Sequence, residues 1–253
     1  MFICGEVKAF IEMFDYPALE LTLGKSFLLR HNLCLLFIFV QLLYHLVNMN
    51  SEHWLLLTGW LAFGVIHSIT ASPQFKKLIQ VISTWGHLHY RLLYILIAAL
   101  SLALLLFYQL SITSILLFTT ISGWIPFFLL TGFSGASIMV ICVYKYFSAA
   151  GNIVLLSPKP ISQTLQTGGI NKFVRHPLYA GTLLFIWSLF FLYPMLSTLV
   201  SNGIITIYVL TGIRFEEKKL INLFGQQYRI YQEKVPMLIP LFKQMLKKFD
   251  GSS

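Results

Sequence analysis

No aspartate or glutamate occurs anywhere from His53 to Phe215, and this long stretch without acidic residues constrains the fold more than any other feature. The chain of 253 residues is 57% hydrophobic and 11% charged, whereas about a quarter of the residues in a soluble domain are charged. Such a composition is expected in a lipid bilayer, where a helix satisfies its own backbone hydrogen bonds. The sequence therefore predicts an all-α integral membrane protein.

The missing acids also exclude several kinds of chemistry. Paired-carboxylate hydrolysis, Ser-His-Asp relays and carboxylate metal sites have no acid to use in that stretch. The three cysteines show no paired spacing, so neither a disulfide framework nor a metal site is predicted. If the N-terminal fifty residues do not fold back, the acidic groups expected in a functional site are Glu216, Glu217 and Glu233.

The apolar runs predict about five to six transmembrane helices. Five spans are expected near residues 54–70, 90–109, 124–146, 178–193 and 196–213. Residues 1–48 are interpreted as an N-terminal extension with a possible transmembrane helix over 33–47, and residues 49–253 as the main domain. Residues 111–122 are interpreted as an interfacial approach to the third span.

The net charge of +9 arises from basic residues between the apolar runs and in the tail. This distribution favours membrane lipid over nucleic acid as a partner, and it orients the basic loops and the C-terminus toward the cytoplasm. Residues 215–235 alternate charged and apolar side chains at helical spacing, which predicts a cytoplasmic amphipathic helix. That helix would bring Glu216 and Glu217 close to Arg175 and His176, although a solvated interfacial helix is the simpler alternative.

The stretch from Arg175 to Gly181 has the pattern of a helix start. Pro177 suits the first helical position, with His176 beside the cap. The backbone N–H groups of the next residues would then be free, and free N–H groups at a helix start can bind an anion. They belong to Leu178, Tyr179 and Ala180. The small residues Ala180 and Gly181 permit close approach of a ligand or another helix. In the third span, a small-residue face for close helix packing is formed by Ser134, Gly135, Ala136 and Ser137. The alternative is a plain helix start at the membrane surface, with the arginine reaching to water.

Four blocks of residues occur in a characteristic order over the second half of the chain. They are TLQTGGI at 164–170, RHPLYAG at 175–181, Glu216-Glu217, and FGQQYRIY at 224–231. In this order and spacing they resemble the isoprenylcysteine carboxyl methyltransferase and phospholipid methyltransferase superfamily. In the first half, HSITAS at 67–72 and YRLLY at 90–94 are similar to the NnrU-like proteins and the methanethiol S-methyltransferases.

The resemblance implies an S-adenosylmethionine-dependent methyltransferase whose cofactor binds at the cytoplasmic face. The cofactor-binding residues implied are Gln163, Thr164, Leu165, Gln166, Asn171, His176, Pro177, Leu178, Tyr179 and Glu216. Methyl transfer from a sulfonium needs a positioned acceptor and no metal. If the acceptor is a thiol, a nearby cation favours its thiolate, and we assign this catalytic role to Arg214 with Glu217 as its orienter.

Two departures from the family pattern bear on the acceptor. Gly212 stands where the eukaryotic isoprenylcysteine enzymes have an arginine thought to hold the substrate carboxylate, and Gln163 replaces a loop histidine. They argue against a prenylcysteine carboxylate and leave a lipophilic or small acceptor, which is a thiol, a carboxylate or a lipid headgroup. The alternative is a non-catalytic membrane scaffold or sensor. His67, near the end of a span, is interpreted as a packing or hydrogen-bonding residue, with catalysis as the other reading.

Overall fold

The computed structural model describes Leu36, Val40 and residues 44–82, 86–120, 122–149 and 164–240. Within these residues the secondary structure is helical, apart from one isolated bridge between Leu116 and Met195. The α-helices are α4 (Ser51–Thr70), α5 (Pro73–Ile82), α6 (Gly86–Ser111), α7 (Ile125–Ala149), α8 (Pro177–Leu192), α9 (Leu196–Phe224) and α10 (Gln226–Lys234). Two 3-10 turns complete the list, η1 (Ser122–Trp124) and η2 (Gly169–Lys172). The expectation of an all-helical protein is confirmed for this part of the chain.

Four segments among the described residues are long and apolar enough to cross a bilayer. They are Ser51–Thr70, Leu93–Ser111, Ser122–Lys145 and Leu196–Phe224, and α8 is a shorter apolar helix. Most of the predicted N-terminal extension, including most of the possible span over 33–47, lies outside the described residues.

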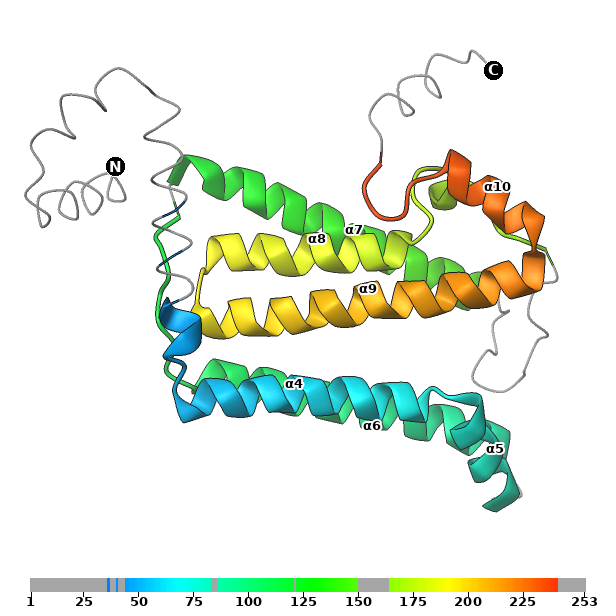
Figure 1. The fold of residues 1–253 in the computed structure, drawn as a ribbon, viewed down its shortest axis with the longest axis horizontal. Helices are drawn as coiled ribbons and strands as arrows, with labels where there is room; N and C mark the ends of the chain where they lie inside the picture. Colours follow the sequence, from blue (N-terminus) through cyan, green and yellow to red (C-terminus); the bar gives the residue numbers. More distant parts are fainter. Residues whose placement is uncertain are drawn as a thin grey trace, which may run out of the picture.

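The five long helices run roughly along one direction, and each runs opposite to the one before it (Figure 1). Helix α4 packs against α6 and α9, while α8 packs against α7 and α9. One end of the molecule therefore holds the segments 112–120 and 193–195. The other end holds α5, η2 and α10, and every residue predicted to bind a cofactor that the structure describes comes from elements that meet at this second end.

Helices α7 and α8 approach each other at two glycines. A Cβ atom placed on Gly135 would lie 2.8 Å from the carbonyl oxygen of Gly181, and one on Gly181 would lie 2.9 Å from that of Gly135. One turn away, Thr131 Oγ1 lies 2.9 Å from Ser188 Oγ. The small residues expected to permit close helix packing do so here, and they fix the position of the first turns of α8.

Helices α8 and α9, which match the expected spans near 178–193 and 196–213, form a hairpin with its turn at Tyr193 and Pro194. The Met195 N–H donates to Tyr193 O at 2.8 Å, and the Leu117 N–H donates to Pro194 O at 2.8 Å. Residues 112–120, which were expected to approach the third span along the interface, form no helix and pass beside this turn.

Helix α9 differs from the prediction at its C-terminal end. The predicted span over 196–213 and the predicted amphipathic helix over 215–235 would meet near Arg214, but a single helix runs from Leu196 to Phe224. The chain breaks at Gly225, whose φ of 56° and ψ of −126° suit a residue without a side chain. The first part of the predicted amphipathic helix thus extends α9, and only the remainder forms α10. Between the first two spans, where the sequence shows basic residues outside the apolar runs, the chain forms the additional helix α5.

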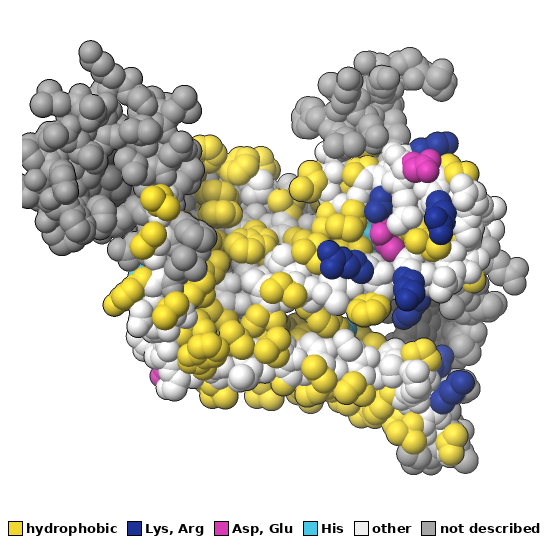
Figure 2. Space-filling model, viewed as in Figure 1, with side chains coloured by type: hydrophobic (Ala, Val, Ile, Leu, Met, Phe, Trp, Pro, Cys, Tyr) yellow, Lys and Arg dark blue, Asp and Glu magenta, His cyan; other side chains and the backbone are white. Residues whose placement is uncertain are grey.

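Figure 2 shows the polarity of the molecule. Hydrophobic side chains cover most of its length, while the Lys and Arg side chains gather at the end that carries α5 and α10. A surface apolar along most of its length, with charge at one end, suits a bundle embedded in lipid with that end at the headgroups.

Candidate active site

The start of α8 has the form that the sequence predicts. His176 is the N-cap residue and Pro177 occupies the first helical position. The Ala180 N–H is not free, however, because it donates to His176 O at 2.9 Å. The predicted anion site is therefore smaller than expected: only the N–H groups of Leu178 and Tyr179 make no hydrogen bond to the backbone of another described residue.

The residues after α10 hold this helix start from one side. The Arg175 N–H donates to Pro236 O at 2.9 Å, and the His176 N–H donates to Met237 O at 3.1 Å. The Arg175 guanidinium, through Nη1, also donates to the carbonyl oxygens of Gln232 and Val235. Arg175 thus fixes the end of α10. The alternative of a plain helix start at the membrane surface required this arginine to reach to water, and it does not.

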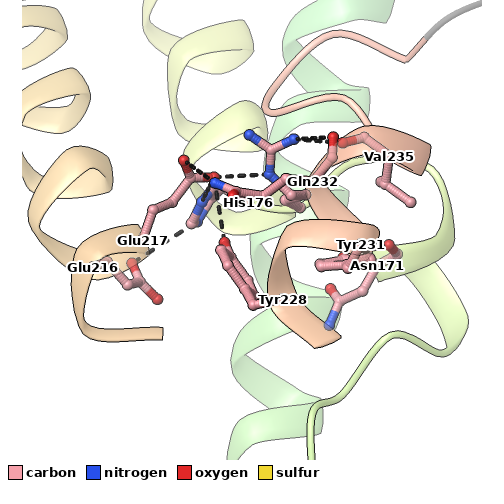
Figure 3. Close-up of polar contacts among 9 residues, drawn as sticks. Asn171, His176, Glu216, Glu217, Tyr228, Tyr231, Gln232 and Val235 are labelled. Atoms are coloured by element: carbon pink, nitrogen blue, oxygen red, sulfur yellow. Dashed lines mark hydrogen bonds and ion pairs between the residues drawn. The ribbon is translucent and has the colours of Figure 1, made fainter. Parts of the chain in front are cut away.

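Glu217 is the centre of the hydrogen-bond network at this end of the bundle (Figure 3). Its Oε1 atom lies 2.7 Å from Arg175 Nε, 3.1 Å from His176 Nε2 and 3.3 Å from the Tyr228 hydroxyl. Its Oε2 atom accepts a hydrogen bond from Gln232 Nε2 at 3.0 Å. A carboxylate offers about four lone-pair sites, so these four donors leave Glu217 little acceptor capacity for a ligand. The residue joins α8, α9 and α10.

Glu216 lies beside Glu217 in the chain but in a different environment. Its Oε2 atom is 3.8 Å from His176 Nδ1, on the other side of the imidazole ring from Glu217. The Glu216 side chain is 45% exposed, compared with 15% for Glu217 and 4% for His176. Glu216 is thus the carboxylate that retains room for a ligand. The prediction that His176 and the glutamate pair fold together is confirmed.

Helix α10 ties the predicted cofactor loop to this network. The Tyr231 hydroxyl donates to Asn171 O at 2.7 Å, and Asn171 Nδ2 donates to Gln166 O at 3.0 Å. Leu165 packs against the buried cluster of Tyr228, Tyr231 and Val235. Thr164 accepts a hydrogen bond from the Gln166 amide at 3.3 Å. Gln163, the remaining loop residue of the prediction, lies outside the described residues.

Burial sets the protonation of the two α10 tyrosines. Desolvation raises the pKa of the Tyr228 phenol, and the adjacent Glu217 carboxylate raises this pKa further. Burial also raises the pKa of Tyr231, with Arg175 opposing the change. Both hydroxyls therefore remain protonated and act as hydrogen-bond donors at neutral pH.

Arg214, predicted to act with Glu217, is exposed on α9 and makes no hydrogen bond or ion pair to another described residue. The structure pairs Glu217 with Arg175 in its place. The catalytic roles assigned to Arg214 and Glu217 remain predictions.

Sequence reasoning did not assign Tyr228 and Gln232 to the site. Both project from α10 toward Glu217 (Figure 3). Their spacing of four residues would place them on one face of a helix, but the sequence offered no sign that this face meets a carboxylate and not lipid.

Comparison with known proteins supplies the family. A family model described as Phospholipid methyltransferase matches residues 127–227. Methanethiol S-methyltransferase 1 of Bradyrhizobium diazoefficiens is 32% identical over 199 residues, 70% of this chain and 63% of the relative. Methanethiol S-methyltransferase of Crocosphaera subtropica is 30% identical over 191 residues, 70% of this chain and 71% of the relative. Protein-S-isoprenylcysteine O-methyltransferase of Rattus norvegicus is 32% identical over 149 residues, 49% of this chain and 50% of the relative.

No solved structure matches the chain significantly. The match spans less than two thirds of the Bradyrhizobium relative, namely 63% of its length. The matched region contains Glu216 and Glu217, and four described helices are long and apolar enough to cross a membrane, which are the features of a membrane methyltransferase family. The chain belongs to the family of membrane methyltransferases that contains the methanethiol S-methyltransferases.

Proposed function

We propose that the chain is a membrane-embedded methyltransferase that uses S-adenosylmethionine to methylate a small or lipophilic thiol. The observation that carries this proposal is the arrangement of the two glutamates around His176. Glu217 has its oxygens occupied by protein donors, while Glu216, 3.8 Å from His176 Nδ1, is half exposed. The names of the relatives support the reaction type.

The groups at this end of the bundle fit the charged part of such a cofactor. Its amino-acid portion carries an ammonium and a carboxylate. Glu216 is suited to pair with the ammonium, and the free N–H groups of Leu178 and Tyr179 are suited to the carboxylate. The loop residues Thr164, Leu165, Gln166 and Asn171, held against α10, are proposed to cover it, with His176 and Pro177 beneath. The cofactor supplies a methyl group bound to a positively charged sulfur.

We propose that this end of the molecule and the C-terminal segment face the cytoplasm. The basic side chains gather there (Figure 2), and loops rich in Lys and Arg remain on the cytoplasmic side of a membrane. The acceptor would then arrive from the lipid side, between helices whose surfaces are apolar.

A thiol suits the acceptor site better than a carboxylate does. Gly212, where a carboxylate-binding arginine would be expected, has open space beside it, since a Cβ atom there would meet nothing within 4 Å. Glycine at this position supplies no cation for a carboxylate. Arg214, exposed at the same end of α9, is proposed to stabilise a thiolate at longer range.

The test is a titration of the purified protein in detergent with S-adenosylhomocysteine, followed by calorimetry. Glu216→Gln should weaken binding about 10- to 100-fold, because a hydrogen bond to a charged group is lost. Glu233→Gln is the matched control, since Glu233 is an exposed glutamate on α10, and its affinity should equal that of the wild type. A wild-type protein without saturable binding would point instead to a non-catalytic scaffold or sensor, and the proposal would be withdrawn.

A further inference from the structure

Three helices bring polar aromatic side chains together near the end of α4. His67 of α4 stacks on Phe63, with ring centroids 5.6 Å apart, and its Nε2 atom lies 3.0 Å from the Tyr94 hydroxyl of α6. The ring of Tyr208 from α9 meets His67 edge-on at 6.3 Å, and the Tyr208 hydroxyl lies 3.1 Å from Ser68 Oγ. We call His67, Tyr94 and Tyr208 the α4–α6–α9 cluster.

One nitrogen of this cluster has no protein partner. His67 Nδ1 is buried and makes no hydrogen bond to any described residue. Buried polar atoms are nearly always hydrogen-bonded, so an unsatisfied one suggests a ligand or a chemical role. In the tautomer whose Nε2–H donates to the Tyr94 hydroxyl, Nδ1 carries a lone pair and can accept a proton.

Tyr179 connects the cluster to the proposed cofactor site. It belongs to the first turn of α8, where its ring centroid lies 5.8 Å from that of His176. Its phenol is close enough to Glu216, Tyr94 and Tyr208 to interact electrostatically with all three. The cluster therefore borders the same region of the molecule as Glu216.

On helix α9, Gly212 lies between Tyr208 of the cluster and Glu216. Tyr208, Gly212 and Glu216 follow one another at intervals of four residues, so they lie along one face of the helix. Tyr208 and Glu216 are about 12 Å apart along the axis of α9. The position beside Gly212 is open, whereas the Tyr208 ring packs against Gly64 of α4, where a Cβ atom would lie 3.1 Å from the ring.

We propose that the acceptor thiol binds beside Gly212, between the cluster and Glu216, and that His67 Nδ1 accepts its proton. This inference rests on the proposed function. It assigns a catalytic residue to the first half of the chain, whereas the cofactor groups all come from the second half. The groups that face His67 from the other helices are the phenols of Tyr94 and Tyr208.

The proton transfer makes the acceptor nucleophilic, because a thiolate attacks and a thiol does not. The S–H bond breaks and its proton moves to Nδ1 of His67. The sulfur lone pair forms the new S–C bond, while the old bond between the methyl carbon and the sulfonium breaks and leaves its electron pair on that sulfur. The products are a methyl thioether, S-adenosylhomocysteine and an imidazolium, which returns its proton to water.

The experiment compares the wild type with His67→Gln, using an alkanethiol and an acidic aromatic thiol that is already ionised at the assay pH. Loss of a general base typically costs about 100-fold or more. We expect a loss of about this size in kcat/KM for the alkanethiol and a loss below about fivefold for the aromatic thiol. His53→Gln is the control, because His53 is the other histidine of α4 and lies buried near the opposite end of the helix.

A second readout is independent of turnover. Thiolate absorbance is measured when the alkanethiol is added to protein saturated with S-adenosylhomocysteine, and it should appear in the wild type and be absent in His67→Gln.

Gly212→Val should weaken thiol binding about tenfold or more, since about 1.4 kcal/mol corresponds to tenfold. Gly203→Val should not weaken it, because Gly203 is equally open but lies on the opposite face of α9. Equal losses for both thiols, or thiolate formation that survives in His67→Gln, would overturn the role of His67 without touching cofactor binding. A wild type that fails to bind S-adenosylhomocysteine would instead refute the proposed function.

Discussion

Arg175 Nε and Glu217 Oε1 lie 2.7 Å apart, although 42 residues separate the two in the chain. Both side chains are largely buried, with exposed fractions of 11% and 15%. This pair joins the start of α8 to the end of α9, and the carbonyl oxygens of Gln232 and Val235 extend the connection to α10. The geometry of the proposed cofactor site therefore depends on one ion pair.

Removing either partner of this pair should destabilise the protein strongly. Glu217→Gln leaves the Arg175 guanidinium without its counter-charge, and Arg175→Met leaves the carboxylate likewise, at a cost of about 3 kcal/mol each. The double variant should lose less than the sum of the two, because the pair acts as a unit. Thermal unfolding in detergent measures this, with Glu233→Gln as the exposed control. Additive losses would show that the two side chains act independently.

The contact between Gly135 and Gly181 should tolerate no added methyl group. Gly135→Ala would bring a Cβ atom to 2.8 Å from the Gly181 carbonyl oxygen and from the Phe185 nitrogen, both backbone atoms that cannot move aside alone. We expect a loss of about 1–3 kcal/mol in unfolding free energy from overpacking. Gly203→Ala is the control, since its Cβ would meet nothing within 4 Å. Equal stability of the two variants would mean that α7 and α8 are not packed as described.

Tyr228 should make stability depend on alkaline pH. Burial and the Glu217 carboxylate raise the pKa of its phenol above the ordinary value of 10.0, so the folded protein holds this proton more tightly than the unfolded chain does. The resulting stabilisation is present below pH 10 and is lost as the pH rises through the folded-state pKa. Tyr228→Phe should cost about 1.5–3 kcal/mol near neutral pH, the value of a hydrogen bond to a charged group.

The difference between Tyr228→Phe and the wild type should then shrink above about pH 10. Unfolding midpoints recorded from neutral to alkaline pH measure it. Tyr193→Phe serves as the control, because Tyr193 is 68% exposed. A difference that stays constant with pH would contradict the protonation state assigned to Tyr228.

Arg214 should influence the acceptor and not the cofactor. Because this side chain is exposed, its effect on a nearby thiolate is limited to that of a surface charge, up to about 1 kcal/mol or fivefold. Arg214→Ala should therefore lower kcat/KM for an alkanethiol by no more than about fivefold and leave S-adenosylhomocysteine affinity unchanged. Lys218→Ala, another exposed cation of α9, is the comparison. A loss of cofactor affinity would place Arg214 in the cofactor site instead.

The parts of the fold that sequence predicted well are those set by local chemistry. Pro177 begins a helix with His176 as its cap because proline lacks an N–H and has a fixed φ. Gly135 and Gly181 pack closely because they lack side chains. The predicted end of the last span near Arg214 was wrong. The charged residues after Arg214 show where the helix leaves an apolar environment, but they do not end the helix itself. The end of α9 is set by the positive φ of Gly225.

The division of roles between Glu216 and Glu217 could not be predicted from the sequence. Neighbouring residues on a helix point about 100° apart, and which of two identical side chains meets Arg175 depends on how α9 is rotated against α8. For the same reason the sequence did not predict that Tyr228 and Gln232 belong to the site. The pairing of His67 with Tyr94 and Tyr208 requires three helices from both halves of the chain, and their packing cannot be read from periodicity.

The backbone bonds from Arg175 and His176 to Pro236 and Met237 also fix an order of events during biosynthesis. All five long helices precede residue 225, so each can enter the bilayer while the last part of the chain is still inside the ribosome. The segment that fastens the helix start emerges only afterwards. A polypeptide that ends before Pro236 would therefore insert all five long helices and still lack the two backbone bonds that hold the start of α8.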